Sequence, residues 1–309
     1  MAKTLIVVAG PTAIGKTSLA IQLALYYQTE IISADSRQFY REMEIGTAKP
    51  SEEEFNTVPH HFINSLSIND NYSVGDYERE ALILIERLFI LHDIVVLVGG
   101  SGLFINAIVN GFDEIPTASV ETREKLNELF KQRGISALQE RLKTIDPEYY
   151  KEADINNPQR LIRAIEVYET SGKPFSEYRR KAIKKRPFNI IQIGLNTDRE
   201  TLYTNINARV DLMIANGLVQ EVEGLQLHRH LNPLNTVGYS ELFKYFDGDS
   251  SLEEAVQMIK QNTRRFAKRQ LTWFKKSGDV TWFKPDEFEN IINYLNSRLH
   301  DHEHGERKN

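Results

Sequence analysis

The feature that most constrains the fold of this 309-residue chain is a glycine-rich octapeptide near its N-terminus, Gly10-Pro11-Thr12-Ala13-Ile14-Gly15-Lys16-Thr17. It fits the pattern G-x-x-x-x-G-K-[ST] and directly follows an apolar, β-branched run at residues 5–9. A strand that leads into a glycine-rich turn and then into a helix is the context in which this pattern binds phosphate groups. The octapeptide therefore predicts a strand, a phosphate loop and a helix over about residues 16–27.

Each residue type in the phosphate loop has a physical role. Gly10 and Gly15 let the backbone turn round an anion, so that successive N–H groups point inward above the helix N-terminus. Lys16 supplies a point charge for the terminal phosphate oxygens, and the hydroxyl of Thr17 is placed to ligate Mg²⁺. A glycine-rich turn that binds nothing is disfavoured, because strand, spacing, Lys16 and Thr17 all agree. The loop does not identify its ligand, since nucleotides are common but any diphosphate would fit.

Composition indicates a globular protein. Hydrophobic residues make up 41% of the chain, enough for an α/β core and a second, smaller unit. No apolar run approaches the roughly 20 residues that cross a bilayer, and the first residues lead into a strand rather than a signal peptide. The chain has no cysteine, which excludes disulfides and thiolate chemistry and agrees with a reducing compartment. We therefore expect a cytoplasmic monomer that makes no contact with membranes.

The distribution of charge points to a polyanionic partner. The net charge of −5 by itself argues weakly against nucleic acid. Between Glu254 and Asp279, however, seven basic residues occur without an acidic one, and residues 179–186 contain six more. These runs are either two polyanion-binding surfaces or two solvated helix faces, and charge alone does not decide between them.

Two segments end at the sheet edge where open α/β proteins bind ligands. Residues 29–34 read as a second strand followed by Asp35, which should share a crevice with the phosphate loop. Its carboxylate is a general base, an outer ligand of Mg²⁺ or a turn cap. Residues 94–98, an apolar run typical of a buried parallel strand, lead into Gly99-Gly100-Ser101-Gly102. Ser101 is a second candidate for this site, unless it only caps the helix that follows.

The order of the predicted elements gives the fold class. Helices are predicted over residues 74–91, 120–133, 135–143, 158–170, 199–216, 219–228 and 252–276. The alternation of strands and helices stops at about residue 112 and resumes with a strand at residues 188–195. We predict an α/β protein with a P-loop NTPase-like parallel sheet and a helical C-terminal part, formed by residues 1–112 and 188–309. Residues 113–187 are predicted to form a helical insertion domain.

The longer basic run lies on the predicted helix at residues 252–276. Phe266, Trp273 and Phe274 alternate there with arginine and lysine, a mixture suited to nucleic-acid backbones and unstacked bases. Packing of an amphipathic helix explains the three aromatic residues equally well.

Other segments are predicted to have no part in the chemistry. Residues 232–239 read as a loop, residues 280–283 as a short strand and residues 301–307 as a disordered polar end. Adjacent His60 and His61 would diverge on a strand and have no third ligand nearby. A structural or substrate-contacting role is therefore favoured over a metal site.

Eight motifs occur in a fixed order along the chain. They are Gly-Pro-Thr-Ala-Ile-Gly-Lys-Thr (10–17), Ile-Ser-Ala-Asp-Ser-Arg-Gln (32–38), Gly-Thr-Ala-Lys-Pro (46–50), Pro-His-His (59–61), Val-Gly-Gly-Ser-Gly-Leu (98–103), Pro-Gln-Arg-Leu-Ile-Arg-Ala-Ile-Glu (158–166), Val-Gly-Tyr (237–239) and Ala-Lys-Arg-Gln-Leu-Thr-Trp (267–273). This ordered set resembles the bacterial tRNA dimethylallyltransferase family across nearly the whole chain. Ser101 stands where the family commonly has Thr and keeps the hydroxyl, whereas Phe104 stands where Tyr is common and loses it.

The resemblance implies transfer of a dimethylallyl group from dimethylallyl diphosphate to N6 of adenine 37 in tRNA, with release of diphosphate. It implies that the phosphate loop holds the diphosphate with Mg²⁺ on Thr17, that Asp35 takes the proton of N6, and that Ser101 fixes the amine in line. Arg123 is implied to lie near the diphosphate or the reacting base. The positions implied to hold the tRNA anticodon stem-loop are Asp35, Ser36, Arg37, Gln38, Ser101, Arg123, Gln159, Arg160, Leu161, Ile162, Arg163, Arg265, Lys268, Arg269 and Gln270.

A P-loop small-molecule kinase is the main alternative, because it would use the same loop and sheet with Asp35 as base towards a hydroxyl group. Such a kinase needs no pair of large cationic surfaces, and the insertion has no evident arginine cluster for a γ-phosphate. In a non-catalytic RNA-binding NTPase, the second alternative, Asp35 would matter little.

Overall fold

The computed structural model describes residues 2–113, 115–179, 183–276 and 279–305. The chain divides into two compact units, one formed by residues 1–109 with residues 186–309 and the other by residues 110–185. Each unit has a buried core of its own. Within the described ranges no helix combines the length and the apolar composition that a membrane span requires.

The first unit is built on a parallel sheet. Its described residues form six strands in the order β3-β2-β4-β1-β5-β6, and every neighbouring pair is parallel. The strands are β1 (Thr4–Ala9), β2 (Ile31–Ser33), β3 (His60–His61), β4 (Ile94–Gly99), β5 (Asn189–Leu195) and β6 (Val280–Phe283). Because β1 lies between β4 and β5, the phosphate loop leaves the middle of the sheet at its carboxyl edge. The predicted α/β class is confirmed.

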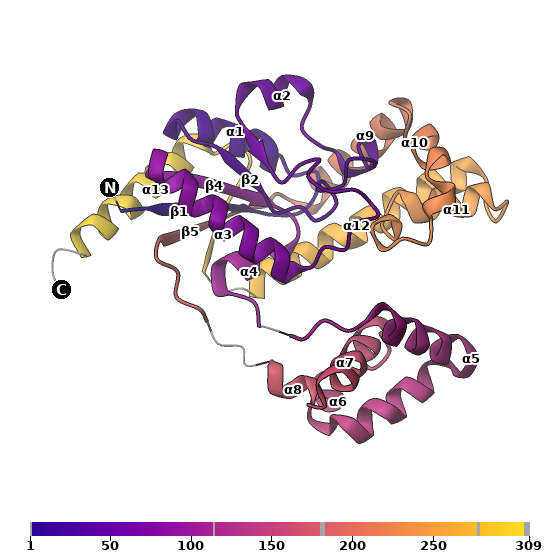
Figure 1. Ribbon diagram of the computed structural model, residues 1–309. Helices are drawn as coiled ribbons and strands as arrows, with labels where there is room; N and C mark the ends of the chain where they lie inside the picture. The colour runs from indigo at the N-terminus through magenta and orange to yellow at the C-terminus, as the bar shows by residue number, and fades with distance from the viewer. Residues whose placement is uncertain (1, 114, 180–182, 277–278, 306–309) are drawn as a thin grey trace. The chain divides into compact units, whose positions relative to one another are not determined.

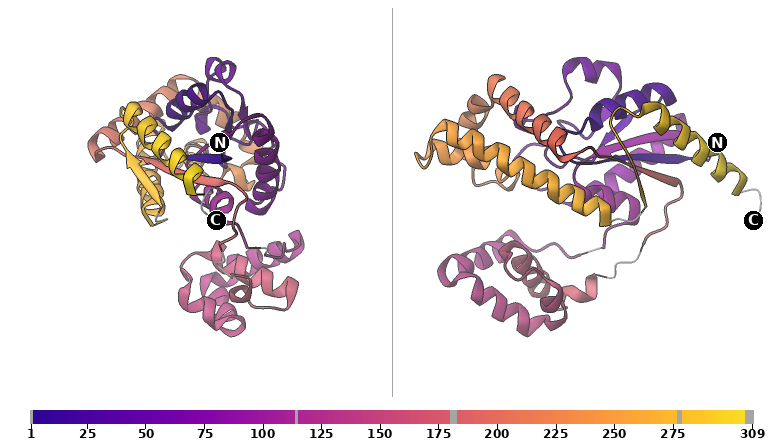
Figure 2. Two further views of the ribbon diagram at one scale, coloured as in Figure 1. Left: turned by 90° about the vertical axis from the view of Figure 1, so that its left-hand side faces the viewer. Right: turned by 180° about the vertical axis from the view of Figure 1, so that it is seen from behind.

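Helices surround this sheet (Figure 1). They are α1 (Lys16–Tyr27), α2 (Glu52–Thr57), α3 (Val74–Leu91), α4 (Gly102–Asn110), α9 (Arg199–Ala215), α10 (Leu218–Gly224), α11 (Tyr239–Phe246), α12 (Leu252–Lys276) and α13 (Phe288–Gly305), with 3₁₀ turns at Ile45–Thr47, Gln226–His228 and Asn232–Leu234. The bounds of α1, α3, α12 and β6 are those predicted from the sequence. The right-hand view of Figure 2 shows α12 along its length.

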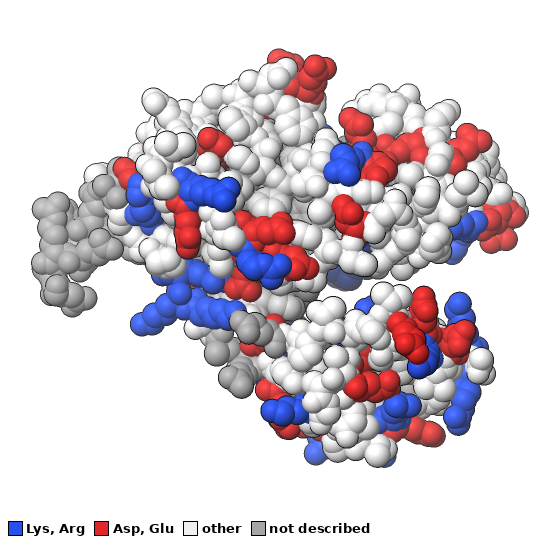
Figure 3. All heavy atoms as spheres, viewed as in Figure 1, with Lys and Arg blue, Asp and Glu red and all other residues white. Residues whose placement is uncertain are grey.

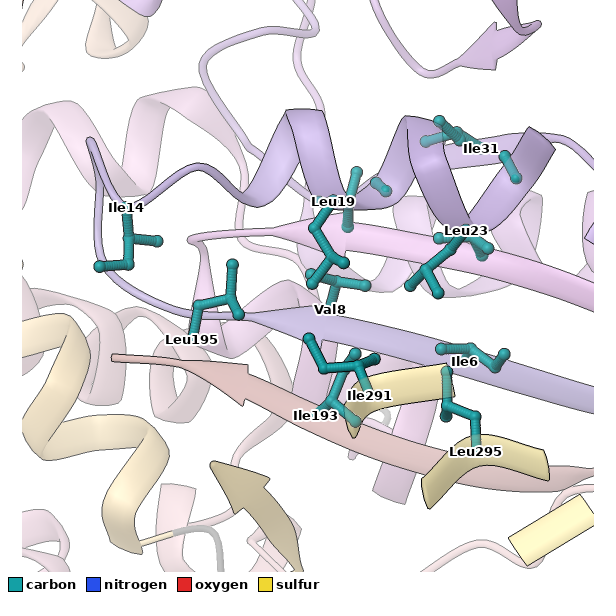
Figure 4. Close-up of a cluster of buried hydrophobic side chains, with 14 of the residues drawn as sticks. Ile6, Val8, Ile14, Leu19, Leu23, Ile31, Ile193, Leu195, Ile291 and Leu295 are labelled. Carbon is teal, nitrogen blue, oxygen red and sulfur yellow. The ribbon is translucent and has the colours of Figure 1, made fainter. Parts of the chain in front are cut away.

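Alternate side chains of the strands fill a core on each face of the sheet. On one face Val8 of β1 packs with Leu19 and Leu23 of α1, and Ile291 of α13 packs over β5 (Figure 4). On the other face the neighbouring residues of β1 pack against α3 and α4. The sheet is therefore buried between two helical layers, and its loops at the carboxyl edge are held by a rigid core.

Two helices differ from the sequence prediction. Residues 301–305 are the end of α13, so the expectation of a disordered tail is wrong for them, while residues 306 and 307 lie outside the described ranges. The helix forms because Ile291, Leu295 and Leu299 recur at helical spacing and are buried. The other helix, α11, begins at the end of the predicted loop and has only 8 residues, too few for a clear periodicity.

The second unit contains the helices α5 (Val120–Ile145), α6 (Pro147–Glu152), α7 (Pro158–Ser171) and α8 (Phe175–Tyr178). At Gly134, φ is 71° and ψ is −174°, so α5 is two helical segments across a kink, as predicted. The side chain of Asn157 accepts hydrogen bonds from the N–H groups of Gln159 and Arg160 and caps α7, which ends at a left-handed Gly172.

Two cations of the shorter basic run, Arg179 and Arg186, form ion pairs within the protein, whereas Lys184 and Lys185 are exposed. The side chain of Arg186 is buried, and its guanidinium donates to Glu78 Oε1 at 2.7 Å and to two backbone carbonyls of α4. Arg179 pairs with Glu152 at 3.2 Å in the second unit. Residues 180–182 lie outside the described ranges. The interpretation as a polyanion-binding surface is wrong for Arg186, whose charge is used to hold the first unit together.

Replacement of Glu78 by alanine should destabilise the first unit by about 3–5 kcal/mol, because Arg186 would keep a buried charge without its carboxylate. The two side chains are only 11% and 8% exposed. Chemical denaturation followed by circular dichroism measures the change. The control is Glu86→Ala, an exposed glutamate on the same helix, for which a change below about 0.5 kcal/mol is expected. Equal losses from both variants would contradict the role of the buried pair.

Candidate active site

The phosphate loop has the backbone conformation that an anion-binding turn requires. The φ angles of Gly10, Ala13 and Gly15 are 153°, 63° and 93°. A Cβ atom at Gly10 would also lie 2.9 Å from the carbonyl oxygen of Leu195, so only glycine fits there. Gly15 directly precedes α1, whose first N–H groups have no acceptor within the helix. The loop and the helix terminus can therefore surround an anion.

Lys16 lies at the base of this loop and is partly buried. Its Nζ donates to the carbonyl of Pro11 at 2.6 Å and makes no ion pair with the residues that the structure describes. Burial lowers the pKa of Lys16 to about 8, the charge of Asp35 opposes that shift and Arg209 adds to it. An ammonium in this position is stabilised by any anion that enters the loop.

Asp35 follows β2 at the carboxyl edge of the sheet. Its Oδ1 accepts a hydrogen bond from the N–H of Arg37 at 3.1 Å, so one oxygen of the carboxylate is a turn cap. The other oxygen has no hydrogen-bond partner among the described residues. The arrangement fixes the carboxylate and leaves one oxygen able to accept a proton.

Ser101 connects two loops rather than capping α4. Its Oγ accepts from the N–H of Ser36 at 3.1 Å and donates to the hydroxyl of Ser36 at 3.2 Å. The loop after β4 is thereby tied to the turn that contains Asp35. Of the two roles predicted for Ser101, this contact supports a place in the site.

A cavity of about 430 Å³ lies at this edge of the sheet. Its lining residues are Thr12, Asp35, Ser36, Arg37, Gly46, Thr47, Ala48, Gly100, Ser101, Gly102, Leu103, Phe104, Arg209, Val210, Met213, Thr236, Val237, Gly238, Ile259, Thr263, Phe266, Arg269, Gln270 and Trp273. The cavity thus combines a few charged and hydroxyl groups with a largely apolar wall, as is typical of small-molecule sites. It brings together seven of the residues expected to act in the site or to bind RNA, namely Thr12, Asp35, Ser36, Arg37, Ser101, Arg269 and Gln270.

The sequence analysis missed Arg209, which lines this cavity from α9. Burial lowers the pKa of Arg209, while the charge of Asp35 opposes the shift. Its guanidinium makes no hydrogen bond or ion pair with the described residues. A helical pattern could have revealed it, because Leu202, Ile206 and Val210 mark the buried side of α9 and Arg209 lies next to that stripe. An arginine at the margin of a buried stripe is an exception to the usual exposure of charge.

Several residues expected to contact RNA have their side chains engaged within the protein. The Nε2 of Gln38 donates to the carbonyls of Thr47 and Ala48 at 3.2 and 3.1 Å. Gln270 is 6% exposed, and its carboxamide bonds to backbone groups of the phosphate loop and of the loop after β4. Leu161 and Ile162 are fully buried in the core of the second unit. In this structure Gln38 is partly buried and the other three residues are buried, so their side chains make contacts within the protein, and their part in RNA binding stays a prediction.

For the three aromatic residues of α12, the sequence allowed either contact with nucleic acid or packing in the core, and the structure divides them between surface and core. Phe274 is 3% exposed and belongs to the core. Phe266 and Trp273 are 39% and 44% exposed and line the cavity. Arg265 and Lys268 are exposed on the same helix. One helix therefore contributes to the sheet core, to the cavity wall and to a cationic surface.

A carboxylate that no motif identified fixes the wall formed by residues 46–48. Glu221 of α10 accepts hydrogen bonds from the backbone N–H groups of Glu44, Ile45 and Gly46 at 3.1, 2.7 and 3.1 Å, and from the hydroxyl of Tyr239 at 2.6 Å. Burial and the Glu221 carboxylate raise the pKa of Tyr239 well above its ordinary value, so its hydroxyl remains a donor. A Cβ atom at Gly46 would meet the ring of Tyr239 at 2.5 Å, so this contact requires glycine.

The second unit carries a cluster of arginines around a buried carboxylate. Glu166 is 1% exposed and accepts from Arg163 at 2.8 Å and from Arg123 at 3.4 Å. Arg123 also donates to Gln159 at 3.2 Å, and Arg160 is exposed. On the face of this unit seen in Figure 3, positive and negative side chains are intermixed. Glu166 therefore holds the guanidinium groups of Arg123 and Arg163 in fixed positions.

Known proteins are similar in sequence to this chain over nearly its full length. A family model described as IPP transferase matches residues 38–277. The tRNA dimethylallyltransferase of Christiangramia forsetii is 53% identical over 300 residues, which are 97% of this chain and 99% of that protein. The tRNA dimethylallyltransferase of Flavobacterium johnsoniae is 51% identical over 304 residues, which are 96% of this chain and 98% of that protein.

Solved structures share the fold as well. The full-length tRNA isopentenylpyrophosphate transferase of Bacillus halodurans gives a TM-score of 0.74 at 36% identity, and the likeness covers 99% of both chains. A eukaryotic dimethylallyltransferase acting on tRNA gives a TM-score of 0.77 at 25% identity and covers 96% of this chain and 78% of its own.

Replacement of Lys16 by methionine should stabilise the ligand-free protein at pH 7 by about 1–2 kcal/mol. The pKa of Lys16 is about 8 in the folded protein against an ordinary 10.5. Between these values the unfolded chain binds more protons, so the stability of the wild type rises with pH. The loss of folding stability caused by the charged Lys16 is therefore largest below about pH 8 and disappears above about pH 10.5.

The gain from Lys16→Met should therefore shrink as the pH is raised, as measured by chemical denaturation of wild type and variant at about pH 7 and pH 10. Lys268→Met, at an exposed lysine of α12, should show no such pH-dependent gain. A variant that is less stable than the wild type at pH 7 would refute the enclosed charge as a destabilising element.

Proposed function

The chain belongs to the IPP transferase family, and from this premise we propose that it transfers a dimethylallyl group from dimethylallyl diphosphate to N6 of adenine 37 in tRNA. One observation supports the proposal above all others. The carboxyl edge of a single sheet holds an enclosed Lys16 ammonium, an Asp35 oxygen without a partner among the described residues and a largely apolar cavity. Dimethylallyl transfer needs an anion-binding site for the diphosphate, a base for the amine proton and an apolar surface for the allylic chain. Lys16, Asp35 and the cavity correspond to these three requirements.

The diphosphate would lie in the phosphate loop. Backbone N–H groups of the loop and of the first turn of α1 would donate to its oxygens, and Lys16 would supply a positive charge. Arg209, which has no partner among the described residues, would contribute a second cation from the cavity wall. As the bond between the allylic carbon and the diphosphate oxygen breaks, charge grows on the leaving group, and these preorganised donors stabilise it.

The residues at the loop fit a Mg²⁺ ion. Thr17 lies in the first turn of α1, and its hydroxyl makes no hydrogen bond to the described residues. No cluster of three or more His, Asp or Glu that could hold a metal occurs in the described part of the chain. Thr17 would therefore hold the ion together with phosphate oxygens and water, a ligand set that Mg²⁺ commonly has. A bound Mg²⁺ would neutralise charge on the leaving diphosphate.

Asp35 would accept the proton of the incoming amine. The N–H of Arg37 fixes its Oδ1, so the other oxygen can point at N6 of the adenine. The new bond joins N6 to the allylic carbon, the bond from that carbon to the diphosphate breaks, and the proton of N6 passes to Asp35. Ser101, which is tied to Ser36, would help to align the amine with the allylic carbon. The adenine must leave the anticodon stack to reach this cavity.

The RNA would be held by cations on both units. On α12 the exposed residues Arg265, Lys268 and Arg269 would contact phosphates, and Phe266 or Trp273 would offer a face for stacking. Phosphates would also be contacted by three arginines of the second unit, Arg123, Arg160 and Arg163. A tRNA substrate would support a cytoplasmic location for the enzyme. Family membership gives no support to the alternative of a small-molecule kinase.

A label-transfer assay tests this function. The protein is incubated with Mg²⁺ and unmodified tRNA and with either labelled dimethylallyl diphosphate or labelled ATP, and the modified nucleoside is weighed by mass spectrometry. Label should enter tRNA from dimethylallyl diphosphate only. Label from ATP alone would overturn the proposal in favour of a kinase.

Substitution of Asp35 by asparagine should lower the rate of transfer about 10²–10⁴-fold, while tRNA binding is retained. Asparagine keeps an oxygen for the N–H of Arg37 but cannot take a proton at neutral pH. Single-turnover rates with saturating tRNA measure the loss. Asp93→Asn changes the same charge just before β4, at the opposite edge of the sheet, and should leave the rate close to that of the wild type. A nearly unchanged rate for the Asp35 variant would remove it as the base.

Binding of tRNA should weaken steeply with ionic strength, because cations of the protein displace counterions from the RNA. Lys268→Ala should reduce the slope of log K against log salt concentration by about 0.7–0.9, the value of one phosphate contact. Arg87→Ala, at an exposed site on α3, should leave the slope unchanged, since α3 does not line the cavity. Affinity that does not depend on salt would count against the assignment of α12 to RNA binding.

A further inference from the structure

Gln270 is buried on α12, and both ends of its carboxamide are engaged. Its Oε1 accepts from the backbone N–H of Thr12 at 2.9 Å, and its Nε2 donates to the carbonyl of Gly100 at 2.9 Å. The residue is 6% exposed. Thr12 is the third residue of the phosphate loop, and Gly100 directly precedes Ser101. One amide thus bridges the loops that follow the adjacent strands β1 and β4.

The space around this bridge admits little else. A Cβ atom at Gly100 would clash with Nε2 of Gln270 and would lie 3.7 Å from Nζ of Lys16. The glycine is therefore required for the amide to reach both backbone groups. The bridge also lies beside the ammonium that the proposed function assigns to the diphosphate.

We propose that Gln270 is a positioning residue that holds the diphosphate loop and the Ser101 loop in register, and that it does not bind RNA. This inference rests on the proposed function, because it concerns the two halves of that site. A carboxamide can form this bridge because its oxygen accepts a hydrogen bond while its NH₂ group, at the same end of the side chain, donates one. Lysine and arginine lack the acceptor, and an ionised carboxylate lacks the donor.

The position of Gln270 explains why one helix serves both substrates. Lys268 and Arg269 precede it and are exposed, while Trp273 lies one turn beyond it and lines the cavity. The bridge therefore fastens the helix proposed to contact RNA to the loop proposed to hold the diphosphate. If the bridge is broken, the diphosphate site should loosen even when no RNA is present.

The test measures binding of inorganic diphosphate with Mg²⁺ by isothermal titration calorimetry, and binding of an anticodon stem-loop RNA by fluorescence anisotropy. Gln270→Met keeps the length of the side chain and loses both hydrogen bonds. Gln270→Glu keeps the shape of the side chain. When it is ionised, however, it places a carboxylate oxygen where Nε2 donated to the Gly100 carbonyl, so that hydrogen bond is lost. At about pH 8 both variants should bind diphosphate about 10-fold more weakly than the wild type. RNA binding without diphosphate should stay within about twofold.

Measurements of diphosphate binding at acid pH distinguish a hydrogen-bonding role of residue 270 from a steric one. Once protonated, the carboxyl group introduced by Gln270→Glu can accept from Thr12 and donate to Gly100, so this variant should regain affinity for diphosphate as the pH falls to about 5.5. Gln270→Met should not. The charged groups nearby are Lys16, Asp35, Arg37, Arg209 and Arg269, and the wild type and all variants share them. Each affinity is therefore compared with the wild type at the same pH.

Gln261→Met and Gln261→Glu, at an exposed glutamine of α12, are the matched controls and should not alter diphosphate binding. Wild-type affinity for diphosphate together with weakened RNA binding in the Gln270 variants would overturn the inference and restore an RNA contact. Failure of Gln270→Glu to recover in acid would also overturn it. If the wild type binds diphosphate but transfers no dimethylallyl group to tRNA, the proposed function fails instead. Should Gln270→Met not fold, the pH series of Gln270→Glu decides alone.

Discussion

The site depends on an ammonium group that the fold encloses without giving it a carboxylate in contact among the described residues. Lys16 bonds to a backbone carbonyl, and burial lowers its pKa to about 8. The compensation from a charged neighbour is the longer-range attraction of Asp35. Such an arrangement is unfavourable in the empty protein and becomes favourable once an anion enters the loop, because the anion offsets the cost of burying the charge. The buried parallel sheet supplies the rigidity that keeps this charge in place.

Much of the fold could be predicted because local signals and tertiary context agree. Gly15 marks the start of α1, and a capping box formed by Ser73 and Asp76 marks the start of α3. The misses have physical reasons. The eight residues of α11 are too few for a periodic pattern, and α13 is amphipathic only up to Leu299, after which polar residues continue the helix.

The site itself could be predicted only where a motif carries the chemistry. The phosphate loop, Asp35 and Ser101 meet at one edge because parallel strands end there. Arg209 belongs to no motif, and Gln270 lies in a basic motif that suggests exposure. Gln270 bonds to a residue 258 positions earlier in the chain, and nothing in its neighbours along the sequence reveals that contact. Sequence motifs therefore identified the residues at the edge of the sheet better than the residues that hold those loops in place.

The loop before residue 47 bears on how selective the protein is for its anion. Its consecutive N–H groups converge on Glu221, whose two oxygens receive all three of them and the hydroxyl of Tyr239. Converging backbone amides of this kind can themselves capture a free phosphate. Because the Glu221 carboxylate already accepts their hydrogen bonds, these amides are not free to bind an anion that enters the neighbouring cavity.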